Sequence, residues 1–228
     1  MMELIAAHRR ALAGALDGLT AEQWRGASLC AGWTPAHVLA HQTMPFRITE
    51  ADYVAGIQRC GGDFTRFSDE MAEADSKRPP AELVAVLRDN ADNPWSPPGG
   101  GLAGALSHDV IHGLDIAWLA SLSYEIPERA MTAVLDMLTS PLVLDTDEDP
   151  AAEVRAAAAD SAVGRATIFG FPLDGIRVVA TDLGWTAGSG AALTGTSRDL
   201  LPLLAGRRIP RERFRGEGVT RAWSLAGR

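Results

Sequence analysis

The chain of 228 residues is long enough for one large domain or two small ones, and its 46% hydrophobic and 22% charged residues predict a folded core. The net charge of -8 and the lack of a basic run argue against nucleic acid or an anionic membrane as the main partner. No apolar run reaches about 18 residues, the N-terminus lacks the order of a signal peptide, and two cysteines make no disulfide framework, so a cytoplasmic, reduced protein is expected.

Taken in chain order, the first half of the sequence predicts helices. Thr34 followed by Pro35 marks the start of a long helix that is expected to run to about residue 56. Pro45 interrupts this helix and removes the donor for the carbonyl of His41, so a kink is expected there, with or without a function. Apolar spacing predicts further helices over residues 3–17, 64–76, 81–90 and 127–138. Another helix is predicted to follow the loop 93–101 and to end near residue 123.

The second half changes character after an acidic loop at residues 145–150, which is a plausible domain junction. A short Ala-rich helix is predicted over 151–159, and from residue 171 the apolar pattern has period two. Strands are predicted at 176–180, 185–186 and 191–194, then a helix from Ser197 to Gly206, and last strands or turns at 214 and 219–225. The predicted fold is therefore α+β, mainly α, with a four-helix bundle over residues 1–150 and a small α/β domain over 151–228.

Four of the five histidines fall in two HxxxH pairs, His37/His41 and His108/His112. A spacing of four stacks two imidazoles on one helical face about 6 Å apart, and Asp115 shares the face of the second pair. Such pairs are common on helices without a metal. Here the flanking residues of the second pair are apolar, and a buried imidazole needs a partner on each nitrogen. The clustering favours a metal site in the bundle core, with His41 as the best candidate for a third ligand.

Three segments in this order resemble the mycothiol-dependent maleylpyruvate isomerase family, whose bundle is DinB-like. They are LCAGWT at residues 29–34, His41, and HDVIHGLD at residues 108–115. The segments at residues 175–182 and 200–207, with Trp185 and Gly195, resemble the small C-terminal domain of that family. The resemblance spans most of the chain. No single segment is specific for the family, but the set of segments in this order is.

The resemblance implies a divalent metal, usually zinc, held by His41, His108 and His112. Three imidazoles also suit nickel, iron or copper. Many members of the family place a glutamate where this chain has His108, and a ligand set of three neutral imidazoles leaves the full charge of the ion, which favours an anionic fourth ligand. The family also implies an important arginine in the C-terminal domain, and Arg207, with Arg208 beside it, matches that position. A cation at the end of a surface helix is the alternative for Arg207.

The predicted function is a metal-dependent isomerase or S-transferase that uses a low-molecular-weight thiol of the mycothiol type and acts on a small electrophile. Asp115 would orient a ligand imidazole, or else make only a helix-end hydrogen bond or ion pair. His37 is expected not to be a ligand, and Cys30 is expected to be a small buried residue. The alternatives are a protein that binds a metal or a small ligand without turnover, and a hydrolase that uses metal-bound water. A His41 ring more than ~8 Å from the other two would remove the metal hypothesis.

Overall fold

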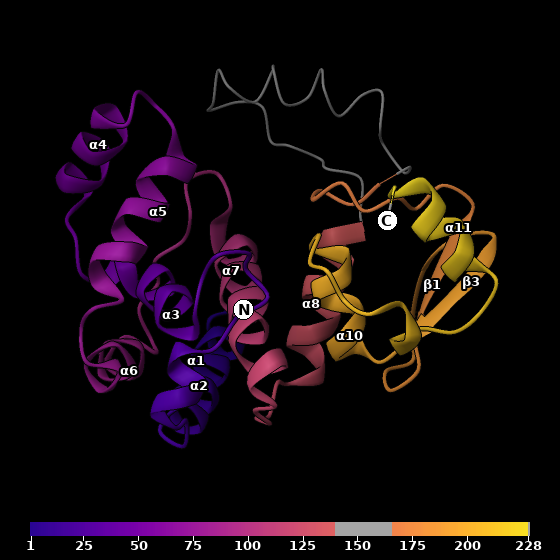
Figure 1. Ribbon diagram of the computed structural model, residues 1–228, viewed down its shortest axis with the longest axis horizontal. Helices are drawn as coiled ribbons and strands as arrows, with labels where there is room; N and C mark the ends of the chain where they lie inside the picture. Colours follow the sequence, from indigo (N-terminus) through magenta and orange to yellow (C-terminus); the bar gives the residue numbers. More distant parts are fainter. Residues whose placement is uncertain (140–165, 228) are drawn as a thin grey trace. The chain divides into compact units, whose positions relative to one another are not determined.

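The computed structural model describes residues 1–139 and 166–227. The chain divides into two compact units, Met1–Pro127 and Glu128–Arg228, called unit 1 and unit 2 below (Figure 1). The mainly helical class with a small sheet is confirmed. The acidic loop, the Ala-rich helix and the predicted boundary at residue 150 lie outside the described residues, so a division at that point stays a prediction.

Unit 1 is helical, and four of its helices pack in a closed ring. Helix α1 packs on α6 and α7, and α3 packs on the same two helices and on α5. The side chains that fill the ring are apolar and almost fully buried, among them Leu12, Leu39, Leu87 and Ile116. The elements are α1 (Met2–Leu16), α2 (Ala21–Arg25), α3 (Pro35–Thr43), the 3-10 turn η1 (Met44–Phe46), α4 (Glu50–Arg59), α5 (Phe64–Asp75), α6 (Pro80–Asp89) and α7 (Gly101–Ala120).

Helix α3 begins where the sequence predicts but ends much earlier. Thr34 caps it, and the His37 side chain reaches back to the N–H of Thr34, which completes a capping box. The predicted continuation to residue 56 is wrong, because the α-helix ends at Thr43 and the next α-helix, α4, begins at Glu50. Pro45 has no N–H to donate, and the carbonyl of His41 accepts the N–H of Met44 instead. The break leaves His41 on the last turn of α3.

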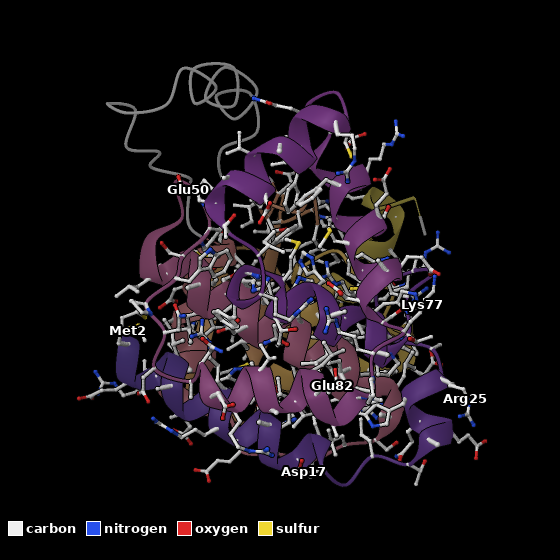
Figure 2. The ribbon with its side chains drawn as sticks, turned by 90° about the vertical axis from the view of Figure 1, so that its left-hand side faces the viewer. Met2, Asp17, Arg25, Glu50, Lys77 and Glu82 are labelled. Atoms are coloured by element: carbon white, nitrogen blue, oxygen red, sulfur yellow. The ribbon has the colours of Figure 1, made fainter. Side chains whose placement is uncertain are left out.

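Most charged side chains of unit 1 lie on its outside. The exposed residues Asp17, Arg25, Lys77 and Glu82 stand at its periphery in Figure 2. Arg9, by contrast, is fully buried on α1. A buried guanidinium is tolerated only when its donors and its charge are matched.

The charge of Arg9 and two of its three nitrogens are matched by α7 and by the loop that follows α6, whereas Nη2 has no hydrogen-bond partner among the described residues. Its Nε donates to Asp109 Oδ2 at 2.6 Å, and both side chains are buried. Its Nη1 donates to the carbonyl oxygens of Asn90 at 3.0 Å and Asn93 at 2.8 Å. The guanidinium also lies over the Phe46 ring, 4.9 Å from its centroid. One side chain therefore links α1, η1, α7 and the loop after α6.

Unit 2 combines helices with a three-stranded sheet of order β2-β1-β3. Strand β1 is antiparallel to β2 and parallel to β3, α11 packs on β1 and β3, and α8 packs on α10 and β2. The Trp185 indole donates to Asp136 Oδ1 at 2.7 Å and so ties β2 to α8. The elements are α8 (Glu128–Thr139), β1 (Ile176–Ala180), β2 (Trp185–Gly188), β3 (Ala191–Gly195), α10 (Ser197–Leu204), η2 (Arg211–Arg213) and α11 (Gly218–Leu225).

The predicted strands and the helix after them are confirmed, but the last segment is not. Residues 219–225 were expected as strands or turns and form helix α11 instead. Val219 and Ala222 are buried and lie three residues apart, a spacing that places both on one helical face against the sheet. Helix α8, which the sequence analysis placed with the bundle, groups with unit 2. Within the described residues, no helix has the length and apolar content needed to cross a bilayer.

Replacing Arg9 by Met should lower the free energy of unfolding by about 3–5 kcal/mol, because Asp109 would remain buried without its cation. Arg10→Met on the same helix is the matched control, since the ion pair of Arg10 with Asp92 is 55% and 75% exposed. That control should lose less than about 1 kcal/mol. Urea denaturation measures both variants, and equal losses would contradict the role given to burial.

Candidate metal centre

Three histidines of unit 1 lie together. His41 is on the last turn of α3, and His108 and His112 are on successive turns of α7. The ring centroids are 5.2 Å apart for His41 and His108, and 4.8 Å apart for each of the other two pairs. Each residue offers a potential ligand atom within 4.8 Å of the others. The rings meet at one point, as the metal hypothesis requires.

Each of the three rings is held through its Nδ1 atom by an oxygen of a neighbouring side chain. The pairs are His41 with Ser68 Oγ at 2.9 Å, His108 with Asp109 Oδ1 at 3.3 Å, and His112 with Asp115 Oδ2 at 2.9 Å. When the two carboxylates are ionised they can only accept, so His108 and His112 then carry their proton on Nδ1, and a serine hydroxyl can accept in the same way. This arrangement leaves Nε2 of each ring as the atom for a metal.

The spacing of the Nε2 atoms suits a metal ion. His41 Nε2 and His108 Nε2 are 3.3 Å apart. A tetrahedral zinc ion with Zn–N bonds of about 2.0–2.1 Å places two nitrogen ligands about 3.3–3.4 Å apart. When both rings are protonated on Nδ1, two lone pairs face each other at this distance, which is favourable only with a cation or a shared proton between them. The three residues therefore fit a divalent metal.

Asp109 stands behind His108 as a buried carboxylate. Burial opposes its ionisation, but the hydrogen bond with His108 and the positive charge of Arg9 outweigh this effect and hold the pKa of Asp109 below its usual range. The Gln42 side-chain amide lies over the same residue and donates to its backbone carbonyl at 3.3 Å. Asp109 thus connects the His108 ring to the buried Arg9 on α1.

Asp115 stands behind His112 and also receives the loop that precedes α3. Its Oδ2 accepts from His112 Nδ1 and, at 3.1 Å, from the Cys30 thiol, and its backbone carbonyl accepts the N–H of Leu29 at 3.0 Å. Asp115 is fully buried. Cys30, His112 and Asp115 form a second group with ligand-type atoms within 4.8 Å of one another. The loop at residues 29–34 and the α7 segment are therefore joined in space as well as in the sequence resemblance.

Two indoles flank the histidines. The ring centroid of Trp33 lies 5.3 Å from that of His41, and the centroid of Trp95 lies 5.5 Å from that of His108. The side chains of His108 and His112 remain 16% and 15% exposed. The centre is therefore mostly enclosed, yet a small molecule can reach it.

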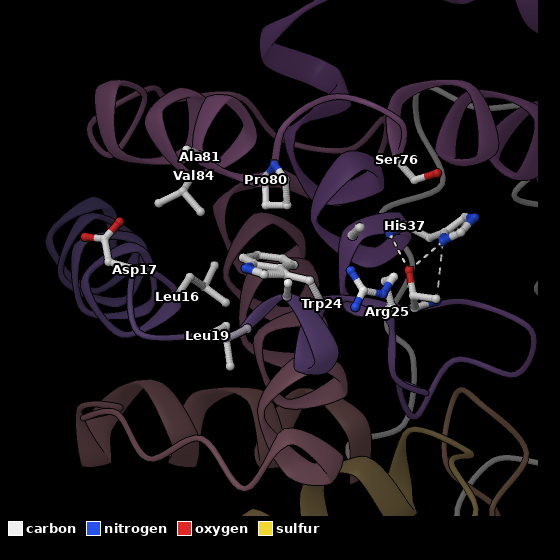
Figure 3. Close-up of a pocket in the computed structure, with 13 residues that line it drawn as sticks. Leu16, Asp17, Leu19, Trp24, Arg25, His37, Ser76, Pro80, Ala81 and Val84 are labelled. Carbon is white, nitrogen blue, oxygen red and sulfur yellow. Dashed lines mark hydrogen bonds between the residues drawn. The ribbon is translucent and has the colours of Figure 1, made fainter.

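Two residues singled out in the sequence lie elsewhere. The His37 ring contacts Thr34 Oγ1 at 2.8 Å and Glu73 Oε2 at 3.0 Å, and it lines a separate cavity of ≈ 630 Å³ with Trp24 and Arg25 (Figure 3). Arg207 belongs to unit 2, where its Nη1 donates to the carbonyl of Ala205 at 2.8 Å. A role of Arg207 toward the histidines stays a prediction.

The sequence analysis missed Arg9, Ser68 and Asp109. Arg9 left a signal, because it falls four residues after Ile5 and three before Leu12, in the apolar stripe of α1. A charge at such a position predicts a buried partner. Asp109 was the one acidic residue between the two histidines of α7, but only the fold shows which atoms it contacts. Ser68 left no signal in the sequence.

Comparisons with known proteins bear on the fold and on the N-terminal part of unit 1. Residues 5–93 match the family model of the mycothiol maleylpyruvate isomerase N-terminal domain, a match that includes His41 and ends before α7. No curated protein matches the chain. Two solved structures match it, one of the mycothiol-dependent maleylpyruvate isomerase and one of a histidine-to-alanine mutant of that enzyme. Each has 13% sequence identity and a TM-score of 0.52, and each match covers 95% of this chain and 91% of the other.

At this level of identity the two solved structures establish the fold, and the family model adds the sequence evidence for unit 1. The resemblance predicted from the sequence is therefore confirmed: the chain has the fold of the mycothiol-dependent maleylpyruvate isomerase, and its residues 5–93 match the model of the mycothiol maleylpyruvate isomerase N-terminal domain.

Proposed function

We propose that this protein is a metal-dependent enzyme that uses a low-molecular-weight thiol of the mycothiol type to isomerise, or to transfer sulfur to, a small electrophile. One observation carries the proposal. Three imidazoles from two helices converge, and each Nδ1 is already engaged by a side chain of the same unit. The fold shared with a mycothiol-dependent isomerase supports the choice of a thiol as the cosubstrate.

His41, His108 and His112 would hold the metal, for which zinc is the first candidate, with nickel and iron as further possibilities. When bound, the ion would lower the pKa of a thiol so that the reactive thiolate is present at neutral pH.

The surrounding residues set the charge and the orientation of this site. Asp115 holds the His112 ring and brings one buried negative charge close to it, whereas the charge of Asp109 is balanced by Arg9. The protein would therefore neutralise only part of the charge of a bound divalent ion, which would favour an anionic sulfur over a neutral group as a further ligand. Such oriented hydrogen bonds also raise the basicity of ligand imidazoles.

The reaction balances without an additional reagent. The thiol sulfur adds to an electrophilic alkene carbon, so that an S–C bond forms as the carbon–carbon π bond breaks. Rotation about the resulting single bond and expulsion of the thiol give the isomer and regenerate the cosubstrate. Departure of a different leaving group gives S-transfer instead. Trp33 and Trp95 flank the rings and would limit the access of water.

The ligand assignment predicts the metal content of three variants. His41→Ala and His112→Ala should lose most of the bound metal, measured by elemental analysis of the purified protein. His37→Ala is the matched control from the other position of the same HxxxH pair and should keep its metal, because its ring faces Thr34 and Glu73. Equal metal content in the wild type and all three variants would end the metal hypothesis.

The thiol assignment predicts that conversion of an electrophile requires added mycothiol. Product formed per minute should rise with mycothiol concentration and saturate, and the His112→Ala variant should fall to the uncatalysed rate. Cleavage of an ester or amide without any thiol would instead identify a hydrolase. Tight retention of the electrophile without product would identify a binding protein.

Asp115→Asn should weaken metal binding by about 10–100-fold, since the amide keeps the shape of the side chain but removes the charge behind His112. Competition with a chelator of known affinity gives the metal dissociation constant. Asp136→Asn in unit 2 is a control for the same chemical change, because its carboxylate contacts the Trp185 indole. An unchanged metal affinity in Asp115→Asn would leave that residue a purely structural role.

A further inference from the structure

A cavity of ≈ 470 Å³ lies in unit 1 between the start of α4 and the loop that precedes α7. Its lining is dominated by prolines, aliphatic side chains and two aromatic rings, those of Tyr53 and Trp95. Burial raises the pKa of the Tyr53 phenol, which stays uncharged. The volume is within the range of small-molecule pockets.

Trp95 connects this cavity to the histidine cluster. Its indole lines the cavity and also meets the His108 ring edge-on, with centroids 5.5 Å apart and an interplanar angle of 66°. The loop that carries Trp95 packs against α7 at Gly104, where an added Cβ atom would lie 3.0 Å from the Pro97 side chain. The Trp95 ring is therefore shared between the wall of the cavity and the histidine cluster.

The charges around the cavity disfavour an anion. Among the described residues that line it, the charged one is Glu50, and none is a lysine or arginine. The N-terminus of α4 would attract an anion, but the side chains of Thr49 and Asp52 already satisfy it in a capping box. On the neighbouring elements, Arg9 is paired with Asp109, as described above, and Arg47 donates to the buried Asp75.

We propose that this cavity receives the apolar, uncharged part of the substrate, so that the protein acts on a neutral apolar electrophile rather than on a dicarboxylate such as maleylpyruvate. The inference rests on the proposed function, because the histidine cluster supplies the chemistry. A carboxylate in this cavity would lose its hydration without gaining a cation and would be repelled by Glu50. An aromatic or aliphatic body would pack against Tyr53, Val54 and Trp95.

A matched pair of probes tests the inference. Methyl cinnamate and cinnamate share one unsaturated, electrophilic skeleton and differ in charge. Equilibrium dialysis in the absence of thiol should show methyl cinnamate bound at least about tenfold more tightly than cinnamate by the full-length protein. Trp95→Ala should reduce binding of the ester, because it removes the wall that the cavity shares with His108.

A charge introduced at the cavity gives the sharper comparison. Val54 is 46% exposed and lines the cavity, so Val54→Arg can place a guanidinium there without disturbing the core. This variant should bind cinnamate as tightly as the ester or more tightly. Leu119→Arg, at a residue that is 45% exposed and outside the cavity lining, should keep the wild-type preference.

Two results would overturn the inference: equal affinity of the wild type for the two probes, or an unchanged affinity ratio in Val54→Arg. Turnover of methyl cinnamate with mycothiol is measured separately. A retained preference for the ester with no thiol-dependent product would refute the proposed function, while the ligand preference of the cavity would stand.

Discussion

A buried imidazole is stable only when both of its ring nitrogens have partners, and this requirement organises unit 1. The protein itself supplies the partner of each Nδ1, through Ser68, Asp109 and Asp115. The Nε2 atoms are thereby turned toward one another on the facing side. The hydrogen bond of His41 with Ser68 joins α3 to α5, whereas those of His108 and His112 lie within α7. The packing of α3 on α7 is therefore what brings the three oriented rings together.

Charge links this site to the rest of the bundle. Asp109 joins the His108 ring to Arg9, and Arg9 in turn joins α1 to the loop after α6. Two buried carboxylates therefore stand behind the histidines of α7. The carboxylate of Asp115 remains near His112, while that of Asp109 is shared with a buried cation.

The two HxxxH pairs show how the same spacing can serve different purposes. In α7 both histidines face the cluster because the helix is continuous through His108 and His112. In α3 only His41 does, since His37 lies in the first turn and completes the capping box with Thr34. A spacing of four guarantees a shared helical face but not a shared partner. The position of each residue relative to the helix ends decided the difference.

The sequence by itself determined the features that depend on neighbours along the chain. The start of α3 at Thr34 and Pro35 follows from local backbone preferences, and the three strands of unit 2 follow from apolar period two. Only the tertiary structure decided that α3 ends before Pro45, that residues 219–225 are helical, and that Cys30 contacts Asp115. These depend on contacts between residues distant in sequence, and side-chain hydrogen bonds across 27 to 100 positions, such as those of Ser68 and Arg9, leave no periodic pattern by which a sequence could reveal them.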